Sequence, residues 1–320
     1  MNILNVGGWY VGNTAILDWM DGFEELAVVK GDCNLIRLEN GIMDMLTETK
    51  IDKKLLMIRI QKKNCIRGFY LSVRHFIGRY SKNLLKQKKK PSHDLYFNFY
   101  STYYRYLMNY EKLLTSNSSF DEIEYWKGWL STLPDLDSSD KKYKHTVYQN
   151  PFFYDETYYG HNKVWPKLFA PHKMIFVHRD PLDQFSDIVN SGSHLDASWS
   201  RFHGNTREMQ PADRFYEISK KIYLARLRMA EHYTPDDLMI FSFEEFINNH
   251  GQVTNKLKDF LNISNNETSM NQRFSLEESR KNIGNGKNNP MVAELLHGKS
   301  HVIEEINILR NRLMKLSTSV

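Results

Sequence analysis

The first twenty residues combine a short apolar run, a glycine-punctuated segment and the start of a helical pattern. Asn2 to Val6 is predicted to be a buried strand, and residues 7–12 follow it as a turn. From Asn13 the apolar residues recur at three- and four-residue steps, which predicts a helix over 13–23. Such a turn can hold an anion, because glycines let the backbone approach it and the N–H groups and dipole of the helix face it. The alternative is an ordinary strand–helix turn with glycines for close packing.

The turn has the spacing of a phosphate-binding P-loop but lacks the lysine of that loop. Gly7 and Gly12 enclose four residues, and Asn13-Thr14 stands where a Lys-Ser/Thr pair is expected. That lysine contacts the β- and γ-phosphates of ATP. The segment therefore predicts a phosphate site without the lysine that binds ATP.

The composition is that of a globular protein. The chain has 320 residues, of which 41% are hydrophobic and 13% aromatic, enough for a large core. A formal net charge of +5 suits an anionic ligand but does not require nucleic acid as a partner. With only Cys33 and Cys65, and no C-x-x-C or H-E-x-x-H pattern, we expect neither a disulfide framework nor a metal site. We find no signal peptide and no run of about 18 apolar residues, and we expect a cytoplasmic protein.

Apolar runs and helical patterns alternate along the chain. Further strands are predicted at residues 145–153, 173–178 and 238–243, and helices at 41–47, 54–86, 181–189, 213–233, 244–263 and 291–315. Strands separated by helices predict an α/β fold with a central parallel sheet flanked by helices. We expect a single domain over residues 1–320, with a helical, aromatic-rich insertion at about 60–140.

Two stretches of this insertion have two interpretations each. The charge run from Lys86 to Lys90 is either a solvated helix end or a peripheral contact with an anionic membrane, at its inner face. The aromatic-rich stretch 95–130 is either core packing or a surface on which sugars stack. Loops usually determine specificity, so we expect acceptor recognition in this stretch and in the polar segment 190–212.

An arginine follows the strand predicted at 173–178. Ligands of open parallel sheets bind at the carboxyl ends of strands, and the planar guanidinium of Arg179 makes paired hydrogen bonds to a phosphate. Asp180 is placed to cap the next helix, and Pro181 suits its first turn. Ser186 follows two helical turns later and could face the same anion. The alternative for Arg179 is a salt bridge with Asp180 or Asp183.

Taken together, these segments resemble the sulfotransferases that use 3′-phosphoadenosine 5′-phosphosulfate (PAPS) as donor. Gly12-Asn13-Thr14 is similar to the Gly-Thr-Thr or Gly-Ser-Ser segment of that family, and Arg179-Asp180-Pro181 matches its Arg-Asp-Pro. Residues 238–246 resemble its Tyr-Glu-Asp-type helix start, and residues 279–287 resemble its late basic loop. The resemblance spans roughly residues 1–315 and is weakest over 60–140. It implies a P-loop-like three-layer domain.

The resemblance also implies a role for each matching residue. The 5′-phosphosulfate would be held by the loop residues, which are Tyr10, Val11, Gly12, Asn13, Thr14 and Ala15. Arg179 and Ser186 would hold the 3′-phosphate. Ser279, Asn282 and Lys287 would lie in the loop that closes over the nucleotide. No metal is required.

The resemblance is greatest to bacterial members that act on surface polysaccharides and other glycans. They have a comparable glycine-rich start and a segment like Arg37 followed by Gly41-Ile-Met-Asp44. A hydroxyl or amine of a glycan is therefore the implied acceptor. Thr14, Arg37 and Asp44 are the implied catalytic residues, with Asp32, Glu156 and His161 as other candidates for the general base.

Two positions depart from the family pattern. Tyr10 stands where the family has a lysine that stabilises the leaving phosphate; Arg37, Lys30 and Lys287 are candidates to replace its charge. The serine that holds the 3′-phosphate usually follows the arginine by eight residues, where this chain has Asp187. Ser186, or Ser191 or Ser193, would have to serve instead.

Two other functions stay open. A degenerate P-loop kinase would need a lysine after Gly12, and Asn13 argues against it. A non-catalytic nucleotide- or glycan-binding protein is favoured by Tyr10 in place of the lysine, and it would bind the cofactor without turnover.

Overall fold

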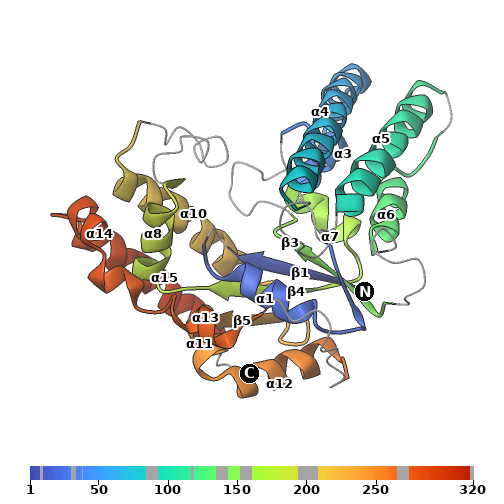
Figure 1. Ribbon diagram of the computed structural model, residues 1–320. Helices are drawn as coiled ribbons and strands as arrows, with labels where there is room; N and C mark the ends of the chain where they lie inside the picture. The colour runs from blue at the N-terminus through green and yellow to red at the C-terminus, as the bar shows by residue number, and fades with distance from the viewer. Residues whose placement is uncertain are drawn as a thin grey trace. The chain divides into compact units, whose positions relative to one another are not determined.

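The computed structural model describes residues 1–7, 10–29, 34–37, 39–83, 93–116, 119–134, 143–151, 161–193, 208–264 and 274–317. Of residues 71–83 and 93–98 only the backbone is described. The chain divides into two compact units (Figure 1). The sheet unit comprises Met1–Val28, Lys144–Tyr159 and Pro171–Val320, and the helical unit comprises Val29–Tyr143 and Gly160–Ala170.

The sheet unit is built on five strands in the order β2-β3-β1-β4-β5. Their bounds are β1 Asn2–Gly7, β2 Leu26–Val28, β3 His145–Gln149, β4 His172–His178 and β5 Leu238–Ser242. All neighbouring strands of this sheet pair in parallel. The predicted α/β class and central parallel sheet are confirmed. β3 ends earlier than predicted, before Pro151, because a proline lacks the N–H that a ladder needs.

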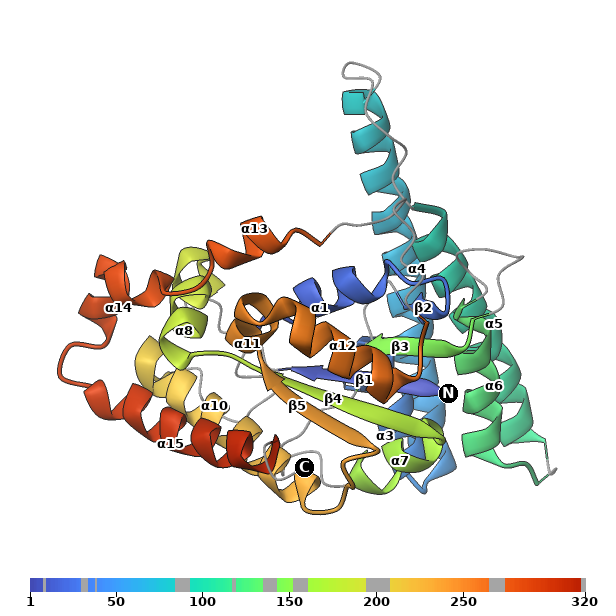
Figure 2. The ribbon, with the colours of Figure 1, turned by 90° about the horizontal axis from the view of Figure 1, so that it is seen from below.

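Helices cover both faces of this sheet. The chain crosses the sheet in one direction from β1 to β2 and in the other from β3 through β4 to β5, so right-handed crossovers place the connecting helices on opposite faces. One face is covered by α1 (Asn13–Met20), α11 (Phe243–Asn248) and α12 (His250–Leu261) (Figure 2). The other is covered by α8 (Pro181–Asn190), α10 (Pro211–Ala230) and α15 (Ser300–Ser317).

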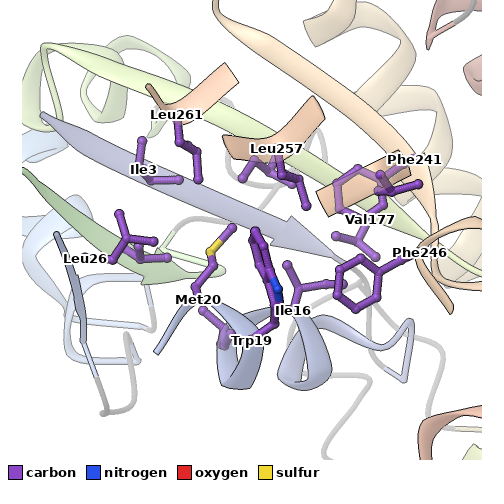
Figure 3. Packing of buried hydrophobic residues seen from close by; sticks show 14 of the residues in the cluster. Ile3, Ile16, Trp19, Met20, Leu26, Val177, Phe241, Phe246, Leu257 and Leu261 are labelled. Carbon is purple, nitrogen blue, oxygen red and sulfur yellow. The ribbon is translucent and has the colours of Figure 1, made fainter. Parts of the chain in front are cut away.

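A buried apolar cluster fixes α1 on the sheet (Figure 3). Ile16 and Trp19 from α1 pack against Ile3 of β1, Val177 of β4 and Leu257 of α12, and all five are less than 9% exposed. The predicted strand and helix of the first twenty residues are confirmed, although α1 ends at Met20. This packing fixes the N-terminus of α1 at the carboxyl end of β1.

The neighbours β1 and β4 mark the point where the chain leaves the sheet toward opposite faces. They are in register from Asn2 beside His172 to Gly7 beside Val177, so their carboxyl ends lie together. The α1 connection leaves one strand and the α8 connection leaves the other. In open parallel sheets the crevice at such a point is where ligands bind.

The helical unit contains the aromatic-rich stretch. Its helices are α2 (Asn34–Arg37), α3 (Ile42–Thr47), α4 (Ile51–Asn83), α5 (His93–Thr115), α6 (Glu122–Thr132) and α7 (Trp165–Leu168). Tyr103, Tyr110, Trp126 and Trp129 are fully buried and contact one another ring to ring, so these aromatics form core. The unit is wider than the predicted insertion, and the charge run 86–90 lies outside the described residues. None of the described helices is long and apolar enough to cross a bilayer.

Two long predicted helices are each two helices. The one predicted at 244–263 divides into α11 and α12 at Asn249, a residue type that favours turns because its side chain competes for backbone hydrogen bonds. The one predicted at 291–315 divides into α14 (Pro290–Leu295) and α15, with Gly298 at φ 70° between them. Between the helices predicted at 244–263 and 291–315, where no helix was predicted, lie α13 (Leu276–Arg280) and a 3₁₀ turn at Asn285–Asn288.

Candidate functional site

The loop after β1 ends in a glycine that no other residue could replace without strain. Gly12 has φ 88°, and a Cβ atom there would lie 2.2 Å from the Phe243 ring. Its carbonyl accepts the first hydrogen bond of α1, from the Ala15 N–H at 3.0 Å. Within the described part of the chain, the N–H groups of Gly12, Asn13 and Thr14 have no acceptor. They are the free donors of a helix N-terminus, which suit an anion.

The buried side chain of Asn13 supports this loop. Its side chain is 5% exposed and folds against Gly7, where a Cβ would lie 2.1 Å from the amide. It donates to Asn150 Oδ1 at 3.3 Å, and the same oxygen accepts from the Gly7 N–H at 2.8 Å. The Asn5 amide donates to the Asn13 carbonyl at 3.4 Å. Asn13 therefore positions the loop, whereas the lysine of a P-loop reaches the ligand.

Sequence reasoning missed Asn5 and Asn150. Asn5 is a fully buried amide within an otherwise apolar strand, and Asn150 has φ 45° directly after β3. A buried polar residue needs partners, so an asparagine among the apolar residues of a predicted strand is the signal that could have indicated both.

Arg179 connects the end of β4 to the loop after β1. It follows β4, is 2% exposed, and stacks on the Phe243 ring at 5.1 Å. Its guanidinium donates to the Tyr10 carbonyl at 3.0 Å and to the Asn282 carbonyl, and it forms an ion pair with Asp187. Its buried Nε has no acceptor within the described residues.

The predicted alternative partners of Arg179 were wrong. Asp180 caps α8 by accepting from the Leu182 and Asp183 N–H groups at 2.9 and 3.2 Å. Asp183 accepts from the Gly284 and Gly286 N–H groups at 2.7 and 2.9 Å. The capping role predicted for Asp180 is confirmed, and Asp183, which is 2% exposed, anchors the late loop to α8.

The other residues predicted to bind the nucleotide lie around this loop. Ser186 is fully buried and its hydroxyl accepts from Asn289 Nδ2 at 2.9 Å. Asn282 contributes its carbonyl to Arg179, and Ser279 is half-buried at the end of α13. Lys287 is exposed and lines a pocket of about 240 Å³ with Asp180 and Glu244 among its walls.

Tyr10 stands in the position of the family lysine. It has φ 57° and is 37% exposed, and its hydroxyl lies 2.7 Å from Ser193 Oγ. Ser191 Oγ donates to Ser193 Oγ at 2.9 Å. A chain of three hydroxyls thus ties the β1 loop to the end of α8. Ser191 and Ser193 were the alternative serines for the 3′-phosphate.

His178, the last residue of β4, is buried and neutral. Its Nδ1 accepts from Arg310 Nε at 3.2 Å, and Arg310 also pairs with Glu244 at 3.0 Å. Glu244 Oε1 accepts from the Asp180 N–H at 2.8 Å. Burial lowers the pKa of His178 well below its ordinary value, and the charges of Arg310 and Arg226 lower this pKa further. The network holds the start of α8 against α11 and α15.

The remaining catalytic candidates lie in the helical unit or outside the described residues. His161 Nε2 lies 2.7 Å from Asp44 Oδ1, and the second oxygen of Asp44 accepts from the Asn40 N–H at 2.7 Å. These two candidates for the base thus form one pair, with His161 3% exposed. Arg37 ends α2 of the same unit. Lys30, Asp32 and Glu156 lie outside the described residues.

The carboxyl ends of β1 and β4 bring together free backbone donors, a helix N-terminus and a buried arginine. This donor set suits a nucleotide anion, since backbone N–H groups and arginine both bind phosphates. Among the residues that the structure describes, no group of side chains could hold a metal ion. No family model and no curated protein matches the chain.

Proposed function

We propose that the chain is a P-loop-like sulfotransferase that transfers a sulfuryl group from PAPS to a hydroxyl or amine of a glycan. The proposal rests on one observation. Arg179, at the end of β4, binds the carbonyl of Tyr10 in the loop after β1. Two segments that resemble the two phosphate-binding segments of PAPS-dependent enzymes thus meet at the point of the sheet where ligands bind.

The free N–H groups of Gly12, Asn13 and Thr14 would hold the 5′-phosphosulfate. Thr14 is exposed, so its hydroxyl can donate to the sulfonate. Sulfuryl transfer, like phosphoryl transfer, is mostly positioning plus stabilisation of charge on the leaving group. Arg179 would bind the 3′-phosphate, with Ser279, Asn282 and Lys287 around the nucleotide.

The acceptor side of the proposal comes from the sequence resemblance. Asp44, paired with His161, is the proposed base, and Arg37 is the proposed positive charge in place of the family lysine. A glycan acceptor, a cytoplasmic location and membrane contact through residues 86–90 belong to the same proposal. An Asp44→Asn variant that keeps full turnover and cofactor binding would remove Asp44 as the base.

One observation favours a second function, non-catalytic nucleotide binding. Tyr10 presents a hydroxyl, not an ammonium group, beside the loop. Such a site would bind nucleotide and leave sulfonate transfer unassisted. An ATP-dependent kinase is less well supported, because Asn13 is buried under the loop where the P-loop lysine would stand.

The proposal is tested by calorimetric titration with 3′-phosphoadenosine 5′-phosphate (PAP), with ADP and ATP–Mg²⁺ as comparison ligands. We expect PAP to bind most tightly, and Arg179→Ala to weaken it by roughly 10- to 100-fold, since charge-assisted hydrogen bonds are lost. Arg312→Ala removes an exposed arginine of α15 and serves as the control. Preference for ATP–Mg²⁺, or no binding of any nucleotide, would overturn the proposal.

PAP binding alone does not separate an enzyme from a binding protein. Release of PAP from PAPS in the presence of pooled glycan acceptors makes that distinction. Transfer supports the sulfotransferase, and tight PAP binding without transfer to any acceptor supports non-catalytic binding.

A further inference from the structure

Asp187 pairs with the guanidinium of Arg179, the group that we propose to bind a phosphate. The carboxylate pairs with Nη1 of the guanidinium, and the carbonyls of Tyr10 and Asn282 accept the other described hydrogen bonds of the guanidinium. A phosphate bound by Arg179 would have to replace this carboxylate or lie beside it. Two anions at one guanidinium repel each other, and they do so strongly where the arginine is only 2% exposed.

Asp187 is more exposed than its partner Arg179, which indicates that Asp187 faces the ligand. The Asp187 side chain is 26% exposed, so it lies at the rim of the site and a ligand can reach it. Arg179 is held from three further directions, by two carbonyls and by the Phe243 ring. The arginine therefore does not need the carboxylate to keep its position.

Asp187 and Arg179 prefer different groups on the ribose of a nucleotide. A carboxylate accepts a hydrogen bond from a ribose hydroxyl, whereas an arginine binds a phosphate at the same position. Here the carboxylate of Asp187 and the guanidinium of Arg179 stand together. The site thus contains one group that favours a ribose phosphate and one that opposes it.

We infer that Asp187 is a specificity-determining residue of the nucleotide site, which opposes a phosphate on the ribose and favours a free hydroxyl there. The inference rests on the proposed function, because it assumes that a nucleotide binds beside Arg179. The native protein should therefore prefer PAP over adenosine 5′-phosphate (AMP) by a smaller factor than a protein that has Arg179 without the negative charge of Asp187.

The test compares the Kd ratio of AMP to PAP in the native protein and in variants of residue 187. Asp187→Asn keeps the shape of the side chain and an oxygen that accepts from Arg179, but removes the negative charge. We expect this ratio to rise about tenfold, mainly through tighter PAP binding. Asp187→Glu keeps the charge and is expected to leave the ratio near the native value.

Asp236→Asn is the control for the change in net charge, since Asp236 is exposed before β5, at the opposite edge of the sheet. A ratio that is unchanged or lower in Asp187→Asn, while the native protein binds PAP, overturns the inference alone and leaves the proposed function standing. If neither nucleotide binds to the native protein or to any variant, both fail. Should Asp187→Asn be poorly folded by circular dichroism, Asp187→Ser replaces it with the same expected result.

Discussion

At the scale of single residues, the site depends on conformations that few residue types can adopt. Gly12 has a positive φ and lies against the Phe243 ring, and that ring also stacks on Arg179. One aromatic side chain therefore contacts both the anion loop and the arginine. A substitution at Gly12 is expected to disturb both.

Gly12→Ala is expected to destabilise the protein by about 2–4 kcal/mol, because left-handed strain adds to overlap with Phe243. Gly298→Ala is the matched control, since Gly298 also has a positive φ but has open space where a Cβ would be. It is expected to lose only about 1–2 kcal/mol. Urea unfolding of the two variants measures the difference, and equal losses would contradict the role of Phe243.

At the scale of elements, the late loop is held to α8 by one buried carboxylate. Asp183 accepts from two backbone N–H groups of the loop, at Gly284 and Gly286. Gly286 also lies so close to α8 that a Cβ there would be 2.5 Å from the Leu182 carbonyl. The loop that contributes the Asn282 carbonyl to Arg179 is thus positioned by α8.

Asp183→Ala is expected to release this loop. The two N–H groups lose their acceptor, at a cost of about 1–3 kcal/mol for each group left buried. Hydrogen exchange at Gly284 and Gly286 should become faster, and PAP binding weaker. Glu278→Ala removes an exposed carboxylate from α13 and is expected to change neither. Unchanged exchange in Asp183→Ala would show that other contacts hold the loop.

The strands β1, β3, β4 and β5 could be predicted because each is a short apolar run, and α1 and α8 because each buries an apolar stripe. β2 was not predicted, because it has only three residues. The helix breaks at Asn249 and Gly298 could not be predicted. The apolar pattern continues across each break, although the chain changes direction there. Pairing between Asp183 and Gly284 joins residues 101 apart, which no local pattern encodes. The same applies to Arg179 and Asp187, whose pairing depends on side-chain directions around α8.

At the scale of the whole molecule, the sequence indicated the parallel sheet and a helical insertion at about 60–140, but not that the helical unit also includes residues 29–59 and 160–170. The connections between neighbouring strands differ greatly in length, since residues 29–144 lie between β2 and β3. Spacing along the chain does not reveal which strands are neighbours. Placing Arg179 beside the first loop therefore needed the pairing of β1 with β4.

The stability of the whole protein is expected to fall as the pH drops from about 6.5 toward 5. Burial lowers the pKa of His145 and of His178, so the unfolded chain binds protons that the folded chain does not. Their stabilising contribution is complete above the unfolded pKa of about 6.5 and is lost as the pH falls below it, by at most about 1.4 kcal/mol per pH unit for each histidine.

Urea unfolding at several pH values measures this dependence. His178→Gln keeps an acceptor for Arg310 but cannot bind a proton, so its slope below pH 6.5 should be smaller than the native slope. An equal slope in the variant would show that other groups cause the dependence.

The location of the nucleotide site is tested most directly by hydrogen exchange of the native protein with and without saturating PAP. We predict slower exchange in three segments, at residues 10–16, 179–187 and 279–288, which meet at Arg179. Residues 231–237, at the amino end of β5, should be unchanged. Bound PAP that leaves these three segments unprotected, or protects a different part of the sheet unit, would contradict a site between β1 and β4.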